Sequence, residues 1–154
     1  MKVLIICKSV HHNNTKKVAE AIAGELKAEI VEPENISEDI LQDYDLIGFG
    51  SGIYFFTHHK DLLEFIDKIP SIKKDCFVFS TKGFTPTKIN HSKIKKRLQE
   101  KGFNIVGEFS CKGYDTIGPL RFFGGINKNK PSNDDIERAR EFAKSLKEEI
   151  RKSK

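Results

Sequence analysis

The chain has 154 residues, with 27 lysines and arginines against 22 aspartates and glutamates and a formal net charge of +5. This length suits one domain with a substantial core, and we expect residues 1–154 to form a single domain. The apolar runs 3–7 and 46–49 are far shorter than the roughly 20 residues of a membrane helix. The chain also starts without the pattern of a signal peptide. We therefore expect a cytoplasmic protein without a membrane span.

The positive charge does not predict nucleic-acid binding. The lysines cluster on helical segments beside acidic residues, and no basic stripe is interleaved with aromatic residues. Three cysteines, Cys7, Cys76 and Cys111, form an odd set without a CxxC pair. They predict buried free thiols in a reducing compartment.

The chain alternates strand patterns with helix patterns. Short apolar runs predict strands, and apolar residues at helical spacing predict the helices between them. Such alternation is typical of an α/β protein whose parallel sheet has helices on both faces. We expect a doubly wound five-stranded parallel sheet of order 2-1-3-4-5. The expected strands are 3–7, 28–32, 45–50, 76–80 and 103–111, and the expected helices are 15–26, 61–69, 88–101 and 132–150.

Several residues predict where the helices begin and end. Asn14 or Thr15 is expected to cap the first helix, and Pro70 to end the second. Ser132 and Asp135 have the spacing of a capping box at the start of the last helix.

The predicted order places a ligand site at the carboxyl ends of the first and third strands. The turn after the first strand, residues 9–15, is polar and leads directly into a helix. The first backbone N–H groups of a helix lack partners within it, so this turn predicts an anion site. Its hydroxyl, imidazole and amide side chains are Ser9, His11, His12, Asn13, Asn14 and Thr15. The plain alternative is a polar surface turn.

Several other ligands are disfavoured by this turn. It lacks the GxxxxGK[ST] and GxGxxG motifs, which argues against ATP and NAD. A low-molecular-weight phosphatase needs an arginine six residues after Cys7, but that position is Asn13. The histidine pairs 11–12 and 58–59 lack further ligands at metal spacing, so we assign no metal site. No residue is a convincing acid, base or nucleophile, and we assign no catalytic residue.

Three loops resemble those of the flavodoxin family. The segment SVHHNNT, residues 9–15, resembles the flavodoxin phosphate loop, although it is one residue longer and has no glycine. The segments GSGIYFFTHHKDLLEFI and FSTKGF resemble the second and third flavin loops. The similarity extends over essentially the whole chain. It implies the flavodoxin fold and a noncovalent flavin mononucleotide (FMN) as cofactor.

The resemblance also implies the residues of the flavin site. The first loop would hold the phosphate, Tyr54 would stack on the isoalloxazine, and the Gly52 peptide would turn to accept a hydrogen bond from N(5)–H of the reduced flavin. The third loop would border the pyrimidine edge, where a cation at Lys82 would raise the flavin potential. The implied cofactor-binding set is Ser9, Val10, His11, His12, Asn13, Asn14, Thr15, Ser51, Gly52, Ile53, Tyr54, Ser80, Thr81, Lys82, Gly83 and Phe84.

Two functions follow from the resemblance, and the sequence leaves both open. The first is a carrier that passes electrons through FMN to a redox partner protein. The second is an FMN-dependent oxidoreductase that reduces a quinone or another small acceptor, linked to NAD(P)H or similar to protoporphyrinogen oxidases. The segment 113–130, with Tyr114, Leu120, Phe122 and Phe123, is expected to cover the flavin, to form an interface or to pack on the sheet. A binding module that lost its flavin is a third alternative, and the oligomeric state is open.

Overall fold

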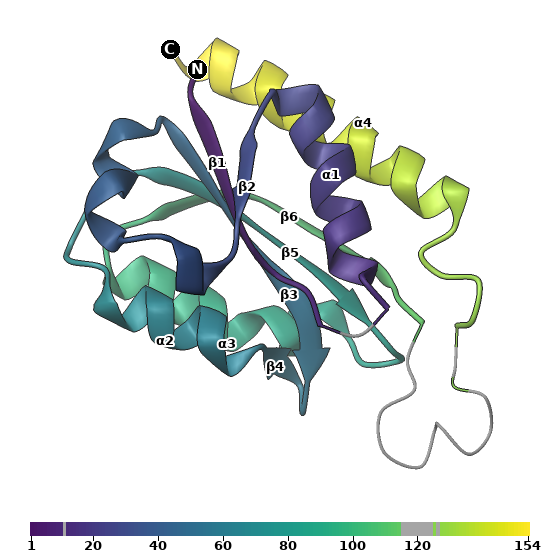
Figure 1. The fold of residues 1–154 in the computed structure, drawn as a ribbon. Helices are drawn as coiled ribbons and strands as arrows, with labels where there is room; N and C mark the ends of the chain where they lie inside the picture. The colour runs from purple at the N-terminus through teal and green to yellow at the C-terminus, as the bar shows by residue number, and fades with distance from the viewer. Residues whose placement is uncertain (11, 115–124, 126) are drawn as a thin grey trace.

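The computed structural model describes residues 1–10, 12–114, 125 and 127–154 (Figure 1). Among these residues, no helix is both long and apolar enough to cross a membrane. Helices and strands alternate along the chain. The strands are β1 (Val3–Lys8), β2 (Glu29–Val31), β3 (Leu46–Tyr54), β4 (Thr57–His58), β5 (Asp75–Lys82) and β6 (Asn104–Lys112). The helices are α1 (Asn14–Leu26), α2 (Lys60–Lys68), α3 (Thr87–Glu100) and α4 (Asn133–Ser153), with short 3₁₀ helices η1 (Pro33–Asn35) and η2 (Glu38–Asp43).

The sheet confirms the predicted doubly wound order. Its parallel strands run β2-β1-β3-β5-β6, which is the order 2-1-3-4-5 once the short strand β4 is set aside. Strand β4 was not predicted, and it pairs antiparallel with the end of β3 through Ile53↔His58 and Tyr54↔Thr57. Strand β3 is therefore longer than predicted and ends in a hairpin.

Helices cover both faces of the sheet (Figure 1). Helices α1 and α4 lie on one face, where they enclose a core that includes Val18, Ile22, Phe77, Phe79 and Leu146. Helices α2 and α3 lie on the other face over a second core that includes Leu4, Phe49, Ile66, Val78 and Leu98. Strands β1 and β5, which flank the central strand β3, are buried almost throughout, because both of their faces meet helices. Cys7, Cys76 and Cys111 are buried free thiols, as predicted.

The helix ends agree only in part with the predictions. Ser132 accepts from the Asp135 N–H and Asp135 accepts from the Ser132 N–H, so the capping box of α4 is confirmed. Helix α2 ends at Lys68, just before Pro70. The predicted cap of α1 is wrong, because its N-cap is Asn13, which has a left-handed φ of 53° and makes no side-chain cap hydrogen bond.

Candidate functional site

A stripe of glycines on β3 leads to a cleft. Gly48, Gly50 and Gly52 occupy alternate positions, so they share the sheet face that α1 and α4 cover. The rings of Phe77 and Phe79 on β5 fill the space over the first two, and a β-carbon at Gly48 or Gly50 would lie 2.3 or 2.2 Å from them. At the third position Gly52 pairs with Thr81, which is much smaller than phenylalanine. The aromatic layer therefore stops, and the cleft begins at Gly52.

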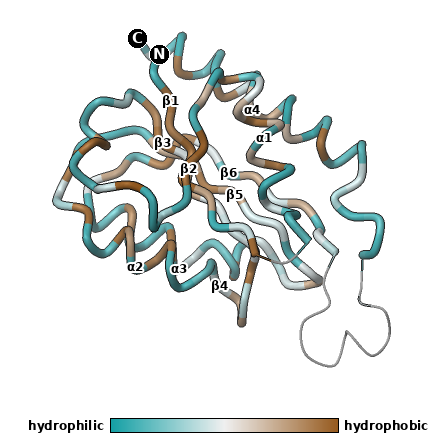
Figure 2. Tube along the Cα trace, in the orientation of Figure 1, coloured by the Kyte–Doolittle hydropathy of each residue, from teal (hydrophilic) through white to brown (hydrophobic). Residues whose placement is uncertain are grey.

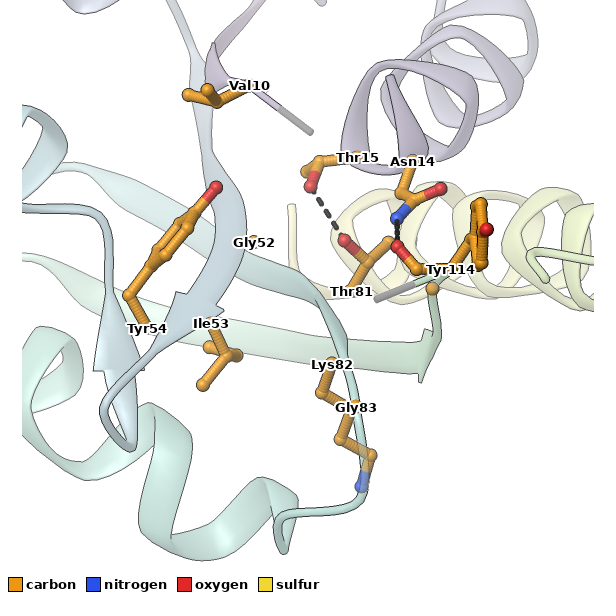
Figure 3. Close-up of a pocket in the computed structure, with 11 residues that line it drawn as sticks. Val10, Asn14, Thr15, Gly52, Ile53, Tyr54, Thr81, Lys82, Gly83 and Tyr114 are labelled. Carbon is orange, nitrogen blue, oxygen red and sulfur yellow. Dashed lines mark hydrogen bonds between the residues drawn. The ribbon is translucent and has the colours of Figure 1, made fainter. Parts of the chain in front are cut away.

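The cleft lies at the carboxyl edge of the sheet, between the end of β1 and the end of β3 (Figure 3). This is the point where the strand order reverses, the usual ligand position in doubly wound sheets. Four chain segments contribute to its wall. They supply Val10, Asn14 and Thr15; Gly52, Ile53 and Tyr54; Thr81, Lys82 and Gly83; and Gly113 and Tyr114.

Thr15 and Thr81 join two of these segments at the base of the cleft. Their hydroxyl oxygens lie 2.8 Å apart and both residues are buried (Figure 3). Thr15 belongs to the first turn of α1, where backbone N–H groups and the helix dipole favour an anion. The hydroxyl pair therefore stands beside a helix N-terminus suited to a negatively charged group.

Asn14 joins α1 to the segment after β6. Its Nδ2 donates to the Tyr114 carbonyl at 2.7 Å, and a β-carbon at Gly113 would lie 2.7 Å from the same nitrogen. A side chain at position 113 would therefore displace the Asn14 amide from this position. The Asn14 Oδ1 is buried without a hydrogen-bond partner among the described residues. Because a buried orphan acceptor is costly, this oxygen is suited to a donor on a ligand.

Tyr54 lies over the place where the cleft opens. Its hydroxyl would be 3.2 Å from a β-carbon at Gly52, so the ring end stands over that glycine. The space left in the cleft is about 30 Å³, enough for about two water molecules. A planar ring system can enter only if Tyr54 swings aside. The Tyr54 ring is half-buried at the end of β3 and packs edge-on against the His59 ring, with centroids 5.2 Å apart.

The structure separates the expected flavin residues into two groups. Those lining the cleft are Val10, Asn14, Thr15, Gly52, Ile53, Tyr54, Thr81, Lys82 and Gly83. Ser9 and Asn13 instead line a second cavity between α1 and β2, and the Ser9 Oγ accepts from the Lys16 N–H at 3.2 Å. The ring of His12 packs against that of Tyr114 in a tilted arrangement, with centroids 4.2 Å apart. Phe84 is 78% exposed, and His11 lies outside the described residues.

Ser51 and Ser80 direct their side chains away from the cleft. Each is fully buried, because alternation along the strand places it on the face opposite Gly52 and Thr81. The Ser51 Oγ accepts from the His59 N–H and donates to the Gly52 carbonyl. The Ser80 Oγ bonds to His91 Nε2 at 2.7 Å. Only the backbone groups of these two serines remain for a ligand.

Lys82 lines the cleft, but its ammonium points along the third loop. The Nζ donates to Thr87 Oγ1 at 2.9 Å. A lysine side chain is long and flexible, so a bound anion can compete for this ammonium. In the segment 113–130, Tyr114 lines the cleft, whereas Leu120, Phe122 and Phe123 lie outside the described residues. The flavin-binding set implied by the sequence does not include Gly113, although a glycine directly after a strand is a signal for a close backbone approach.

Neither Cys7 nor His91 is placed to act as a nucleophile or a base. Burial raises the pKa of the Cys7 thiol to about 12, so the reactive thiolate is scarce. His91 connects Ser80 to Glu108, with Nδ1 3.0 Å from Oε2 of the carboxylate. Burial lowers the His91 pKa, although Glu108 opposes the shift. Ser80 and His91 are fully buried between β5 and α3, where a substrate does not reach them, whereas Glu108 is exposed on β6 and also pairs with Lys95.

The fold and the cleft define a flavodoxin-like protein: a doubly wound sheet with its ligand cleft between β1 and β3. The sequence matches the family described as flavodoxin domain over residues 4–115. An uncharacterized protein of Methanocaldococcus jannaschii is 54% identical over 147 residues, which are 95% of this chain and 98% of that protein. The chain therefore belongs to the flavodoxin family.

Solved structures of flavodoxins share the fold. A flavodoxin from the domain Archaea superposes with a TM-score of 0.73 at 17% identity, covering 98% of this chain and 99% of that one. Flavodoxin 2 from Bacillus cereus gives a TM-score of 0.72 at 21% identity, covering 97% and 99%. At these identities the likeness is one of fold alone.

Proposed function

We propose that the protein binds FMN in the cleft between β1 and β3 and carries electrons through it. The observation that carries this proposal is the opening at Gly52, where the aromatic layer stops beside the first turn of α1. A flavin needs a flat space bordered by backbone, next to a phosphate site, and these two features adjoin here. The bound flavin supplies the redox chemistry, while the protein supplies position and electrostatics.

The residues of the cleft fit this group in their chemistry. The N-terminus of α1 and the Thr15 hydroxyl provide donors for the phosphate. The buried Asn14 Oδ1 suits a ribityl hydroxyl, because it is an acceptor that lacks a donor. Tyr54 offers an aromatic face for the ring, and Gly52 and Gly83 allow close approach of backbone.

A titration of the flavin-free protein with FMN tests the proposal. We expect quenching of flavin fluorescence with one FMN per chain. We expect Thr15→Val to weaken FMN binding about tenfold or more, because it removes a hydrogen bond to a charged group. Ser92→Ala is the matched control, since it removes a hydroxyl from the exposed side of α3. Protein that takes up no FMN would refute the proposal.

A second function, an FMN-dependent oxidoreductase with a small acceptor, is favoured by one observation. An apolar groove of about 360 Å³ lies under the β3–β4 hairpin, between Phe55, Leu63 and Lys93, and Tyr54 lines both this groove and the cleft. A small quinone in the groove would adjoin the flavin position. Steady-state turnover of NAD(P)H with a soluble quinone, by the isolated holoprotein, would identify the enzyme. Its absence, together with reduction in two separate one-electron steps, would identify the carrier.

A further inference from the structure

Exposed apolar side chains gather around the mouth of the cleft. Five large apolar residues at this end of the sheet are at least 48% exposed, and they come from the loops after β1, β3 and β5 and from the first turn of α3. Phe55, 95% exposed, is the most prominent, and the hairpin tip that carries it is brown in Figure 2. The five are Val10, Phe55, Phe56, Phe84 and Ile89. An apolar set of this kind on one end of a protein marks a contact surface.

The two phenylalanines at the tip of the β3–β4 hairpin have backbone conformations that are unfavourable for aromatic residues. Phe55 and Phe56 are the two central residues of the turn between β3 and β4, with φ of 49° and 65°. Two positive φ values define a type I′ turn, for which asparagine followed by glycine is the favoured pair. Aromatic residues in this conformation are outliers, and such outliers concentrate at functional positions.

Lysines outnumber carboxylates at the same end of the sheet. Between the last residues of the parallel strands and the first turns of the following helices, the described residues include nine lysines and five carboxylates. The lysines are Lys8, Lys16, Lys17, Lys60, Lys82, Lys88, Lys112, Lys128 and Lys130, and the carboxylates are Glu32, Glu34, Asp61, Asp134 and Asp135. Most of the chain's net charge of +5 is therefore located at the cleft end.

An apolar centre within a charged rim is the usual anatomy of a protein–protein interface. The rim is basic, so the complementary partner is acidic, and the long-range field would speed its encounter. The five apolar residues frame the opening through which an electron would pass. A bilayer would meet the same residues but would neither give nor take electrons.

We infer that the cleft end of this protein, with Phe55 and Phe56 at its centre, is the docking surface for an acidic electron-carrier protein. The inference rests on the proposed function, since electrons would pass between the carrier and the flavin in the cleft. Docking itself requires only the surface, which the flavin-free protein also presents.

A small acidic ferredoxin and a basic cytochrome c are suitable probes. With the FMN-loaded protein, we expect electron transfer from reduced ferredoxin to slow as ionic strength rises. With oxidised cytochrome c as acceptor, the rate is expected to rise under the same change. Reversing two rim charges in Lys60→Glu/Lys88→Glu is expected to reduce the salt dependence with ferredoxin. A ferredoxin rate that is independent of salt, or increases with it, would overturn the inference.

The double variant Phe55→Asn/Phe56→Gly tests the apolar centre and keeps the turn, because it installs the preferred type I′ pair. We expect it to weaken ferredoxin binding at low salt about tenfold or more, as loss of a central aromatic contact does. Ile40→Asn is the matched control, since Ile40 is 38% exposed but lies on η2, outside the cleft end. Equal losses in both variants would contradict the inference.

Two further outcomes separate the alternatives. The inference fails if the double variant lowers FMN affinity but leaves the ferredoxin dissociation constant unchanged, because the phenylalanines would then cover the flavin. It also fails if the protein sediments with phosphatidylglycerol vesicles and does not bind ferredoxin. If the protein binds no FMN, the proposed function fails, while calorimetric titration of the flavin-free protein with ferredoxin still decides the docking surface.

Discussion

Replacement of His58 should change how stability depends on pH. His58 is 1% exposed, and its Nε2 lies 3.0 Å from the Phe79 carbonyl. Burial lowers the pKa of this histidine from 6.5 to about 3, and the neighbouring His91 ring, with its centroid 5.0 Å away, adds to the effect. The carbonyls of Phe79 and Asn90 act in the opposite direction but do not outweigh burial.

The direction of the pH dependence follows from the number of protons that the folded and unfolded states bind at His58. Below a pH of about 6.5 the unfolded chain binds a proton at His58 that the folded protein does not bind, so acidification favours unfolding. Stability is fully present above about pH 6.5 and falls progressively toward the folded pKa of about 3. Between about pH 7.5 and pH 5 the loss from this residue is about 2 kcal/mol. His91, whose pKa burial also lowers, adds a loss in the same direction.

Urea unfolding at these two pH values measures the effect. In His58→Gln, whose amide can still donate to the Phe79 carbonyl, we expect the pH-dependent loss to shrink by about 2 kcal/mol. His12→Gln, which removes an exposed histidine, is the control. Carboxyl groups titrate mainly below this window. An identical loss in the wild type and in His58→Gln would refute the reasoning.

Further substitutions test other parts of the structure. Gly50→Ala should destabilise the protein by about 1–3 kcal/mol, because the new methyl group would lie 2.2 Å from the Phe79 ring. Gly24→Ala, where nothing lies within 4 Å, should stabilise it by about 0.5–1 kcal/mol, and urea midpoints decide both. Ser132→Ala removes the capping box of α4 and should cost about 1 kcal/mol in the same assay. Lys82→Gln should lower the FMN midpoint potential, because it removes a positive charge near the reduced flavin. If the screened attraction between the Lys82 ammonium and the flavin is about 1 kcal/mol, the decrease is about 20 mV for a two-electron couple. An unchanged potential would indicate that the ammonium stays at Thr87.

The strand order could be predicted because each buried strand is a continuous apolar run, and right-handed crossovers leave few arrangements for such runs. The hairpin after β3 could not be predicted. Its turn contains Phe55 and Phe56 instead of asparagine and glycine, so the usual signal is missing. The cap of α1 was misplaced for a similar reason, since Asn13 acts through its left-handed backbone rather than through its side chain.

The cleft residues were only partly predictable. The loops could be recognised from the sequence, but the sheet face toward which each side chain points could not. Ser80 and Thr81 are neighbours in sequence, yet alternation directs one toward His91 and the other toward Thr15. Gly113 was omitted from the flavin set because its role depends on contact with Asn14, nearly a hundred residues earlier in the chain. Whether these residues hold FMN remains a prediction.

The glycine stripe on β3 implies that the depth of the cleft changes only in steps. Strands β3 and β5 are in register, and each level of the stripe is two residues, or roughly 6.6 Å, along the strand. A phenylalanine in place of Thr81 would extend the core by one level and close the opening over Gly52. A small residue in place of Phe79 would deepen the opening by the same length. A single position on β5 could thus convert a binding protein of this fold into a closed scaffold, with the backbone unchanged.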